Sequence, residues 1–427
     1  MILPLYRAIT TVMAPAIRLT LDWRIRRGKE DAARLPERMG IASQPRPAGT
    51  LIWLHAASVG EAVSMLPIIA ALQSRPGHTV LMTTGTVTSA AMMAERLPTG
   101  AIHQFVPVDR LAWVRRFLDH WRPNLALWCE SEFWPNLLGE IAARQIPAIL
   151  LNGRVSDRSF ARWRHLPGVI KPLLSCFVLC LGQSERDASR LTQLGARSTA
   201  CLGNLKFAAP PLLADVDALA DLRQVAGTRP RWLAASTHDG EELMAAHVHR
   251  LLAPRFPGLL TIIAPRHPGR GDAIARDLAA QGFTLVQRSK GGRIGPEVEI
   301  YLADSMGELG LWIRLAPLVF MGKSLIGQGG QNPLEPARLR ASVLFGPHMG
   351  NFIDIARRMR EAGAASEVAD EGELASAVAA RLGDEEMMLR EGEAAQIFAS
   401  AEDGVLPAVV GAIDAWLAQG EEKHAGA

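Results

Sequence analysis

The segment His55–Glu61, with the sequence HAASVGE, joins an apolar run to a segment of helical periodicity. The run Leu51–His55 predicts a buried strand, and a loop of small residues then leads into a helix that begins near Gly60. Free amides at the start of a helix attract anions, and Glu61 would lie in the first helical turn. A carboxylate there fits a general base or a charge that complements the helix dipole. Position alone favours the second role and leaves the first open.

A second polar group lies in Ala235–Glu242, with the sequence ASTHDGEE, again between an apolar run and a helical segment. The hydroxyls of Ser236 and Thr237 and the free loop amides would make a phosphate site. The same pattern is also an ordinary N-terminal helix cap. Arg266, in the segment APRHPGR, follows the next expected strand and would lie within reach of this loop. Because arginine binds phosphate or carboxylate through two parallel hydrogen bonds, these residues indicate an anion site.

Two further segments carry acidic residues suited to a sugar ligand. In Gly327–Pro336, with the sequence GQGGQNPLEP, Asn332 would cap a helix whose first turn presents Glu335. A carboxylate in that place can accept both hydroxyls of a ribose. Glu308, in the segment Asp304–Leu309, would do similar work or hold a loop amide.

Two common nucleotide motifs and a metal site are not indicated. Gly322-Lys323-Ser324 resembles the end of a Walker motif, but Pro317 stands where the first glycine belongs. The glycines at 327, 329 and 330 lack the dinucleotide spacing. The eleven histidines show neither HExxH nor any paired ligand spacing. We therefore expect no ATP hydrolysis, no NAD binding, no catalytic metal and no cofactor.

Short apolar runs alternate with amphipathic segments from residue 50 onward, as in βαβ units with a parallel sheet. We expect strands at 51–55, 79–83, 125–129, 148–151, 177–181, 231–235, 259–264, 299–302, 318–321 and 342–345. We expect helices at 61–72, 89–97, 112–121, 136–144, 309–315, 333–339 and 406–417. The alternation pauses at 204–228, so the class is α/β with two sandwiches, a linker and a cleft between them. The polar segments above fall at strand carboxyl ends, where such sheets bind ligands.

Composition agrees with a globular protein of two domains. The chain has 427 residues, of which 48% are hydrophobic and 21% charged, and its net charge is +3. This excess is too small to indicate a nucleic-acid partner and suits an anionic substrate or membrane surface. The four cysteines match no zinc or disulfide pattern, so we expect them to be reduced, as in the cytoplasm.

The N-terminal residues 1–21 are apolar but include Arg7 and Arg18, and a basic cluster with Trp23 follows. The pattern has neither the basic start nor the cleavage site of a signal peptide. An apolar helix that ends in tryptophan and cations is typical of an interfacial membrane anchor, which we favour over a membrane-spanning helix. The alternative is a core helix followed by a solvated basic loop.

Eight segments in order resemble those of the 3-deoxy-D-manno-octulosonic acid (Kdo) transferases. They are WLHAASVGE, ESEFWPNLL, NGRVSDRSF, GNLKF, ASTHDGEE, APRHP, DSMGEL and GGQNPLEP with VLFGPHMGNF, between residues 53 and 352. The resemblance implies a GT-B fold: two Rossmann-like domains with a cleft between them, an N-terminal membrane-associated helix, and a C-terminal helix that returns to the first domain. The implied domains are an anchor at 1–30, an acceptor-binding domain at 31–212, a donor-binding domain at 213–400 and the returning helix at 401–427.

The resemblance also implies roles for individual residues. Glu61 would be the catalytic base. The residues implied at the donor CMP-Kdo are Ser236, Thr237, Arg266, Met306, Gly307, Glu308, Asn332 and Glu335. Those implied as acceptor, carboxylate or phosphate contacts are Ser58, Gly60, Glu130, Glu132, Arg154 and Lys206. The chain departs from the family at Gln331, where GGHN is usual, and at Lys323, where GGS is usual.

The implied activity is an inverting, metal-independent transfer of Kdo from CMP-Kdo to lipid IVA in lipopolysaccharide biosynthesis. The implied place is the cytoplasmic face of a bacterial inner membrane, with membrane lipids as further partners. The alternative within the same fold is an enzyme that uses a UDP-sugar, such as a lipid-linked N-acetylglucosaminyltransferase or a UDP-GlcNAc 2-epimerase. A ligand-binding protein without catalysis is a third hypothesis, but such proteins are usually exported and carry a signal peptide.

Overall fold

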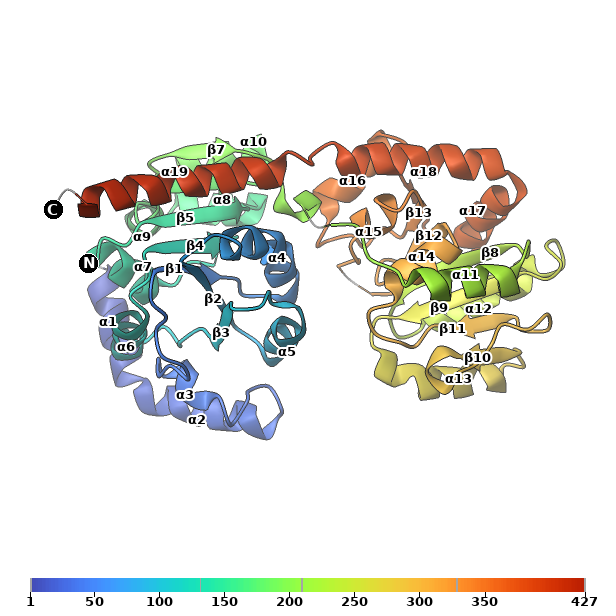
Figure 1. Ribbon diagram of the computed structural model, residues 1–427, viewed down its shortest axis with the longest axis horizontal. Helices are drawn as coiled ribbons and strands as arrows, with labels where there is room; N and C mark the ends of the chain where they lie inside the picture. The colour runs from blue at the N-terminus through green and yellow to red at the C-terminus, as the bar shows by residue number, and fades with distance from the viewer. Residues whose placement is uncertain (1, 131, 209, 328, 426–427) are drawn as a thin grey trace. The chain divides into compact units, whose positions relative to one another are not determined.

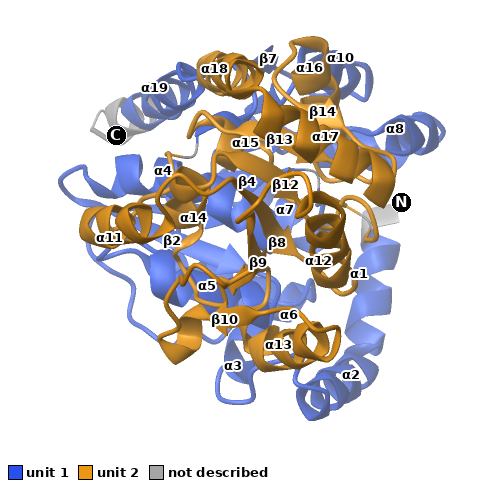
Figure 2. Ribbon diagram, turned by 90° about the vertical axis from the view of Figure 1, so that its right-hand side faces the viewer, with its two compact units in different colours: residues 1–209, 402–427 blue, residues 210–401 orange. Residues whose placement is uncertain are grey.

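The computed structural model describes residues 2–130, 132–208, 210–327 and 329–425. The chain divides into two compact units, which Figure 2 colours separately. Unit 1 comprises residues 1–209 and 402–427, and unit 2 comprises residues 210–401. Each unit is built around a seven-stranded parallel sheet. The α/β class expected from the sequence is therefore confirmed.

The sheet of unit 1 has the strand order β3-β2-β1-β4-β5-β6-β7. The strands are β1 (Thr50–His55), β2 (His78–Thr84), β3 (Ile102–Phe105), β4 (Leu125–Cys129), β5 (Ala148–Gly153), β6 (Leu179–Gly182) and β7 (Thr199–Cys201). The order reverses between β1 and β4, which pair directly. Loops that leave neighbouring strands at such a reversal separate to opposite faces, so the carboxyl ends of β1 and β4 form the expected binding edge.

Helices cover both faces of this sheet. They are α4 (Val59–Gln73), α5 (Val87–Arg96), α6 (Leu111–Trp121), α7 (Pro135–Ala143), α8 (Asp157–Arg164), α9 (Pro167–Leu174), α10 (Glu185–Gln193), the short η1 (Leu205–Ala208) and α19 (Val405–Ala425). Alternate residues of β1 enter separate cores: Trp53 packs in one cluster and Leu54 in the other. This alternation follows from the two-residue period of a strand with both faces covered.

Helix α19 belongs to unit 1 although it ends the chain. Its residues Val405, Val409 and Ile413, spaced four apart, are buried in the same core as α4. Figure 1 shows it in red beside the green and blue elements of unit 1. The stretch Glu385–Ala418, which includes part of α19, is long and apolar enough to cross a membrane by length and composition. One face of α19, which carries these three residues, packs on the core of unit 1.

The sheet of unit 2 has the order β10-β11-β9-β8-β12-β13-β14. The strands are β8 (Arg231–Thr237), β9 (Leu260–Pro265), β10 (Leu285–Gln287), β11 (Ile300–Leu302), β12 (Leu318–Met321), β13 (Ser342–Phe345) and β14 (Ser366–Glu367). Its helices are α11 (Val216–Ala226), α12 (Glu241–Leu252), η2 (Pro268–Arg270), α13 (Gly271–Ala280), η3 (Arg288–Lys290), α14 (Leu309–Leu315), α15 (Leu334–Ala337), α16 (Ile353–Glu361), α17 (Glu371–Gly383) and α18 (Glu385–Ser400). Here the order reverses between β8 and β12.

The N-terminal segment forms two helices, α1 (Ile2–Val12) and α2 (Ala14–Arg26). Eleven residues in α1 rise only about 16 Å, far less than the roughly 30 Å of a bilayer core. Among the described residues, the stretch that meets the spanning criterion lies near the C-terminus. A membrane-spanning helix at the N-terminus is therefore not supported. Instead, α1 packs against α6, α7 and α9 of unit 1.

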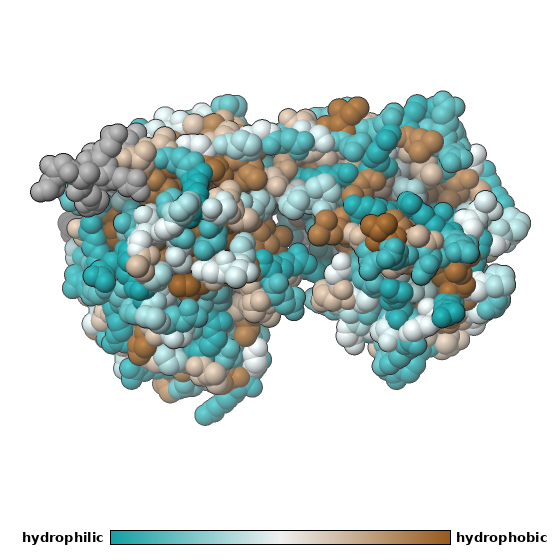
Figure 3. All heavy atoms as spheres, viewed as in Figure 1, coloured by the Kyte–Doolittle hydropathy of each residue, from teal (hydrophilic) through white to brown (hydrophobic). Residues whose placement is uncertain are grey.

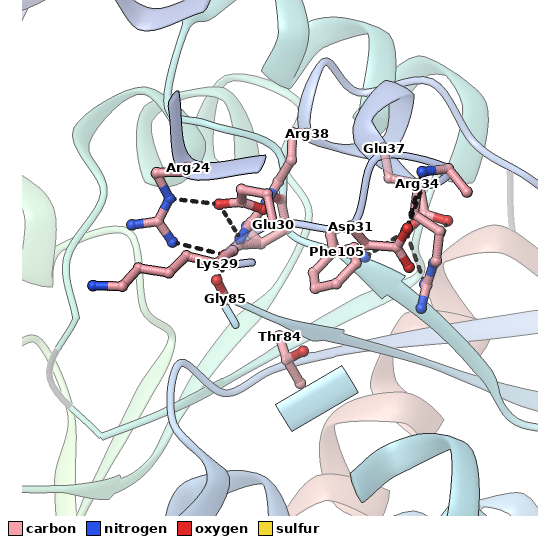
Figure 4. A network of polar contacts seen from close by, with 12 residues as sticks. Arg24, Lys29, Glu30, Asp31, Arg34, Glu37, Arg38, Thr84, Gly85 and Phe105 are labelled. Atoms are coloured by element: carbon pink, nitrogen blue, oxygen red, sulfur yellow. Dashed lines mark hydrogen bonds and ion pairs between the residues drawn. The ribbon is translucent and has the colours of Figure 1, made fainter. Parts of the chain in front are cut away.

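The segment after α2 is held by ion pairs around the buried carboxylate of Glu30, which Figure 4 shows. Glu30 accepts hydrogen bonds from Arg24 at 2.8 Å and from Arg38 at 3.0 Å. Arg38, in the short helix α3 (Leu35–Arg38), also donates to the carbonyl oxygens of Val106 and Gly85. Arg24, one of the basic residues that follow the apolar N-terminal segment, is thus paired within the protein.

On the face drawn in Figure 3, apolar residues lie scattered among hydrophilic ones.

Candidate active site

Glu61 lies in the first turn of α4, immediately after the carboxyl end of β1. Its carboxylate accepts hydrogen bonds from the amide of Ala57 at 2.9 Å and from the hydroxyl of Ser58 at 2.8 Å. Ser58 in turn caps the helix by accepting the amide of Glu61. Ser58 and Gly60 are both exposed. The helix-capping role considered from the sequence is therefore present, and it fixes a half-buried carboxylate at the switch point of unit 1.

Glu130 follows β4, the strand beside β1, with its side chain 3.7 Å from the ammonium of Lys206. Burial raises the pKa of the Glu130 carboxyl, the charge of Lys206 opposes that rise, and the charge of Glu61 adds to it. Arg154, just after β5, also lowers this pKa through its charge. Burial and the charge of Glu61 likewise raise the pKa of Glu132. The residues that the sequence singled out in unit 1 thus form one electrostatically coupled group of three acids and two cations.

Two buried residues that the sequence analysis missed support this group. The imidazole of His55 is fully buried, with Nδ1 3.0 Å from the hydroxyl of Thr83 and its ring 4.5 Å from that of Trp128. Burial lowers the pKa of His55 to about 3, so the ring is neutral. Asn152 accepts the amide of Leu205 and so holds the turn that carries Lys206. Both residues lie in segments that resemble the family, WLHAASVGE and NGRVSDRSF, but the sequence analysis gave neither of them a role.

Strained backbone gathers at the carboxyl ends of the central strands. Glu130, Asn152, Ser236 and Lys323 have φ values of 57°, 54°, 54° and 59°, in the left-handed region. Such conformations cost about 1–3 kcal/mol for residues other than glycine and concentrate at functional sites. These four follow or end β4, β5, β8 and β12, two strands of each sheet. The strain therefore marks the same edges as the polar segments.

In unit 2, the loop after β8 is held by carboxylates of α12. The hydroxyl of Thr237 is fully buried and donates to Glu242 at 3.0 Å. Glu242 also accepts from the guanidinium of Arg270 at 2.8 Å. The Thr237 hydroxyl therefore fixes the loop in this structure, whereas Ser236 beside it is half-buried. Arg270 escaped the sequence analysis, although it closes the segment that contains Arg266.

A group of cations and imidazoles lies around this loop. The amide of Arg266 donates to the carbonyl of Thr237 at 3.0 Å, which joins the ends of β9 and β8. Burial lowers the pKa of His238, and the charges of Lys323, His267 and Arg266 lower it further, whereas the charge of Glu241 opposes the shift. The ring of His238 lies 3.0 Å from the side-chain nitrogen of Gln331. Gln331, where the family usually has histidine, thus serves as a hydrogen-bond partner of His238. The collected positive charge suits an anionic ligand.

The residues expected near the nucleotide lie on two loops of unit 2. Met306 is exposed, and Gly307 has a φ of 81° with open space where a side chain would stand. Partial burial would raise the pKa of Glu308, but hydrogen bonds from Arg288 and Ser305 hold it below its usual range. The guanidinium of Arg288 donates two hydrogen bonds to the Glu308 carboxylate, at 2.7 and 3.1 Å. Glu308 therefore already has a strong partner that the sequence did not reveal.

Asn332 and Glu335 stand at the start of α15, after β12. The side-chain oxygen of Asn332 accepts the amide of Leu334 at 3.2 Å, but the cap position of α15 is Pro333 rather than Asn332 as expected. Glu335 is half-buried in the first turn. Residue 328, within the same glycine-rich segment, lies outside the described residues. The carboxyl edge of unit 2 thus presents cations, hydroxyls and a carboxylate, as a ligand with phosphate and ribose requires.

Comparison with known proteins identifies relatives of this chain. Residues 33–209 match the family model described as 3-deoxy-D-manno-octulosonic-acid transferase (kdotransferase). A probable mitochondrial 3-deoxy-D-manno-octulosonic acid transferase of Arabidopsis thaliana is 36% identical over 396 residues, which cover 90% of this chain and 89% of that protein. The 3-deoxy-D-manno-octulosonic acid transferase of Haemophilus influenzae is 34% identical and covers 84% of this chain and 86% of that protein.

The fold has solved counterparts as well. UDP-GlcNAc 2-epimerase from Neisseria meningitidis superposes with a TM-score of 0.58 at 12% identity, over 85% of this chain and 99% of that one. At that identity the likeness shows the fold alone, and it confirms the GT-B architecture expected from the sequence. The two relatives above are 36% and 34% identical to this chain over 90% and 84% of its length. The chain belongs to the 3-deoxy-D-manno-octulosonic acid transferase family.

Proposed function

We propose that this Kdo transferase moves Kdo from CMP-Kdo to lipid IVA with inversion at the anomeric carbon. The observation that supports this most directly is the fixed carboxylate of Glu61 at the switch point of unit 1. A catalytic base must present an oxygen in a defined direction, and hydrogen bonds from Ala57 and Ser58 supply that definition. Each carboxylate oxygen accepts more than one hydrogen bond, so a substrate hydroxyl still has an acceptor.

In the proposed reaction, Glu61 removes the proton from the primary hydroxyl of the distal glucosamine of lipid IVA. The freed oxygen electron pair attacks the anomeric carbon of Kdo as the bond to CMP breaks. Glu130, Glu132, Arg154 and Lys206 would contact the acceptor or the Kdo carboxylate. The coupled charges of Glu130 and Lys206 support a polar surface there rather than an apolar one.

Negative charge grows on the phosphate of CMP as it leaves. Arg266, with the ammonium of Lys323 in the same group of charges, would stabilise it, and Ser236 would bind beside them. Asn332 and Glu335 would meet the ribose, and Met306 and Gly307 would line the nucleotide. We propose that these cations take the part that a divalent metal has in other transferases. Activity measured in excess EDTA should then equal activity in untreated buffer.

The direct test is a reaction of the purified protein with lipid IVA and CMP-Kdo generated in the assay. Mass spectrometry should find lipid IVA heavier by one or more Kdo residues. Calorimetric titration should show that CMP binds more tightly than UDP. Tighter binding of UDP, with no Kdo-bearing product, would contradict the proposal and favour an enzyme that uses a UDP-sugar.

We also propose that the protein works at the cytoplasmic face of a bacterial inner membrane, through an interfacial contact of α1 and α2. Leu5, Ile9, Val12, Leu19 and Trp23 are exposed on these helices. Arg26, Arg27 and Lys29 follow and are exposed as well. Exposed apolar residues beside cations suit an anionic lipid surface. The protein should float with anionic vesicles, and the floating fraction should be smaller for Trp23→Ser. An equal floating fraction with neutral vesicles would contradict a contribution of the cations to membrane binding.

A further inference from the structure

We propose that Glu241 is a positioning residue for the donor site, because its buried carboxylate ties the loop after β8 to the loop after β12. This inference rests on the proposed function, since it concerns how the surface for the donor is shaped. The two loops leave neighbouring strands at the switch point of unit 2. Ser236 lies near the end of β8 and Lys323 follows β12, and both are expected at or near the nucleotide.

The contacts of Glu241 are unusual for a residue at the start of a helix. Its side chain is fully buried. One oxygen, Oε2, accepts the amide of His238 at 2.9 Å and the amide of Lys323 at 2.6 Å. The other, Oε1, accepts the amides of Ser324 at 3.2 Å and Leu325 at 3.4 Å. A single carboxylate thus collects four backbone amides from two loops that are more than eighty residues apart.

Helix capping alone does not explain this arrangement. A capping glutamate accepts an amide about three residues before it, as Glu241 does from His238. The bonds to 323–325 add nothing to the start of α12, because those residues belong to another loop. They do satisfy three amides that would otherwise be left without an acceptor in a largely buried turn. The carboxylate therefore has the place of an anion inside a nest of amides.

The backbones of the two loops are also in direct contact. A Cβ atom added to Gly322 would lie 2.5 Å from the carbonyl oxygen of Ser236 and 2.8 Å from Oε2 of Glu241. The amide of Gly322 donates to the carbonyl of Ala235 at 2.8 Å. Only glycine fits there without displacing one of the loops. The hydrogen bonds of Glu241 and the missing side chain of Gly322 therefore both set the distance between the two loops.

This link extends to the third loop of the edge. The hydroxyl of Ser324 accepts the amide of Gly346, just after β13, at 2.8 Å. The carbonyl of Lys323 accepts the amide of Gly330 at 3.0 Å, within the glycine-rich segment that leads to Asn332. Lys323, whose backbone is left-handed, is thus bonded on both sides, through its amide to Glu241 and through its carbonyl to Gly330. One carboxylate thus stands at the centre of a preformed set of donor loops.

The first test is Glu241→Gln in the full-length protein, measured by hydrogen exchange without any ligand. Glutamine has the size of glutamate but replaces one acceptor oxygen with a donor, so at least one amide loses its partner. We expect peptides that cover 321–326 to exchange about ten-fold faster or more, the factor that corresponds to one lost bond to a charged acceptor. The matched control is Glu373→Gln, because Glu373 accepts one local amide, that of Ala369, at the start of α17. It should leave peptides 321–326 unchanged.

The second test measures binding and kinetics of the same two variants. Glu241→Gln should weaken CMP binding and raise KM for CMP-Kdo by about ten-fold, with KM for lipid IVA unchanged. A general loss of stability would not change KM for CMP-Kdo while leaving KM for lipid IVA unaltered. If Glu241→Gln fails to fold, Gly322→Ala displaces the same loops and should raise the donor KM alone.

The outcomes separate this inference from the proposed function. Unchanged exchange at 321–326 would overturn the link between the loops. Faster exchange with an unchanged donor KM would overturn the positioning role. If the wild-type protein binds no CMP, the proposed donor is wrong, while the exchange experiment still decides whether Glu241 joins the loops.

Discussion

Ser58 and Glu61 exchange hydrogen bonds across the first turn of α4, with the hydroxyl donating to one carboxylate oxygen and accepting the Glu61 amide. The other oxygen accepts the amide of Ala57. Both oxygens thus have fixed directions before any substrate binds. Helix capping and general-base catalysis, which compete as explanations of the sequence, are compatible in the structure, since the cap supplies the orientation that a base needs.

The first prediction concerns Glu61→Gln. The amide oxygen still accepts a bond from Ser58 or Ala57, but it cannot take a proton from a hydroxyl. We expect kcat to fall about 100-fold or more, the usual scale for the loss of a general base, with little change in thermal midpoint. Turnover and differential scanning fluorimetry of the same preparation measure both quantities.

The control for helix capping is Thr86→Ala. Thr86 caps α5 in the same unit by accepting the amide of Ser89 at 3.1 Å. Its loss should cost about 1 kcal/mol of stability and leave turnover near the wild-type value. If Glu61→Gln also kept near-normal turnover, Glu61 would not be the base.

The second prediction concerns the pH dependence of stability at Glu130. Because burial raises the pKa of its carboxyl in the folded protein, the folded state holds the proton more tightly than the unfolded state. The stability from this proton is present at low pH and is lost as the pH rises through the folded pKa. Glu130→Gln cannot lose a proton, so its thermal midpoint relative to wild type should rise as the pH increases above 4.5, the ordinary pKa of a glutamate.

Glu386→Gln is the matched control for that measurement. Glu386 is an exposed residue of α18, with its side chain 82% accessible. Its thermal midpoint relative to wild type should be nearly constant over the same pH range. A constant difference for Glu130→Gln as well would mean that burial does not raise the pKa of this carboxyl.

Most strands could be predicted from the sequence because central strands of a covered parallel sheet are continuous apolar runs. The expected bounds 125–129, 318–321 and 342–345 are those observed. The four strands that were missed, β3, β7, β10 and β14, are the edges of the two sheets. They have two to four residues and include polar ones, as in IHQF and LVQ. A short edge strand gains less from burial and so leaves a weaker pattern.

The sequence located the site segments but not the partners of their side chains. Glu308 was expected at a nucleotide, and only the structure shows that Arg288, twenty positions earlier, holds its carboxylate. Glu241 was part of a recognised segment, yet its bonds to 323–325 depend on two strands that meet through a reversal of strand order. Spacing along the chain carries no information on such pairs. The roles of Glu61 and the donor residues stay predictions until the experiments above are made.

The third prediction concerns Arg266→Lys. Lysine keeps the charge but loses the paired donors that bind phosphate in two places. We expect KM for CMP-Kdo to rise about ten-fold, while KM for lipid IVA stays within about two-fold of wild type. The control is Arg250→Ala, because Arg250 is an exposed residue of α12 whose guanidinium lies 4.3 Å from the centre of the Phe283 ring. A donor KM that rises equally in both variants would contradict a phosphate contact by Arg266.

The fourth prediction concerns the buried ion pairs in Figure 4. Arg38 and Glu30 have side chains 7% and 3% exposed, so Arg38→Ala would leave a buried carboxylate without its second cation. The carbonyl oxygens of Val106 and Gly85 would lose this donor as well. We expect a loss of about 3 kcal/mol, near the lower end for a broken buried pair, since Arg24 still contacts Glu30.

Arg24→Ala tests the same acid from its exposed side. The side chain of Arg24 is 35% accessible, so solvent screens its pairing with Glu30. Its removal should cost about 1 kcal/mol or less, and the buried partner Arg38 would still neutralise the carboxylate. Calorimetric unfolding of both variants should therefore show a much larger drop in thermal midpoint for Arg38→Ala. Equal drops would mean that burial does not set the strength of these pairs, and that the segment after α2 is held by its apolar contacts instead.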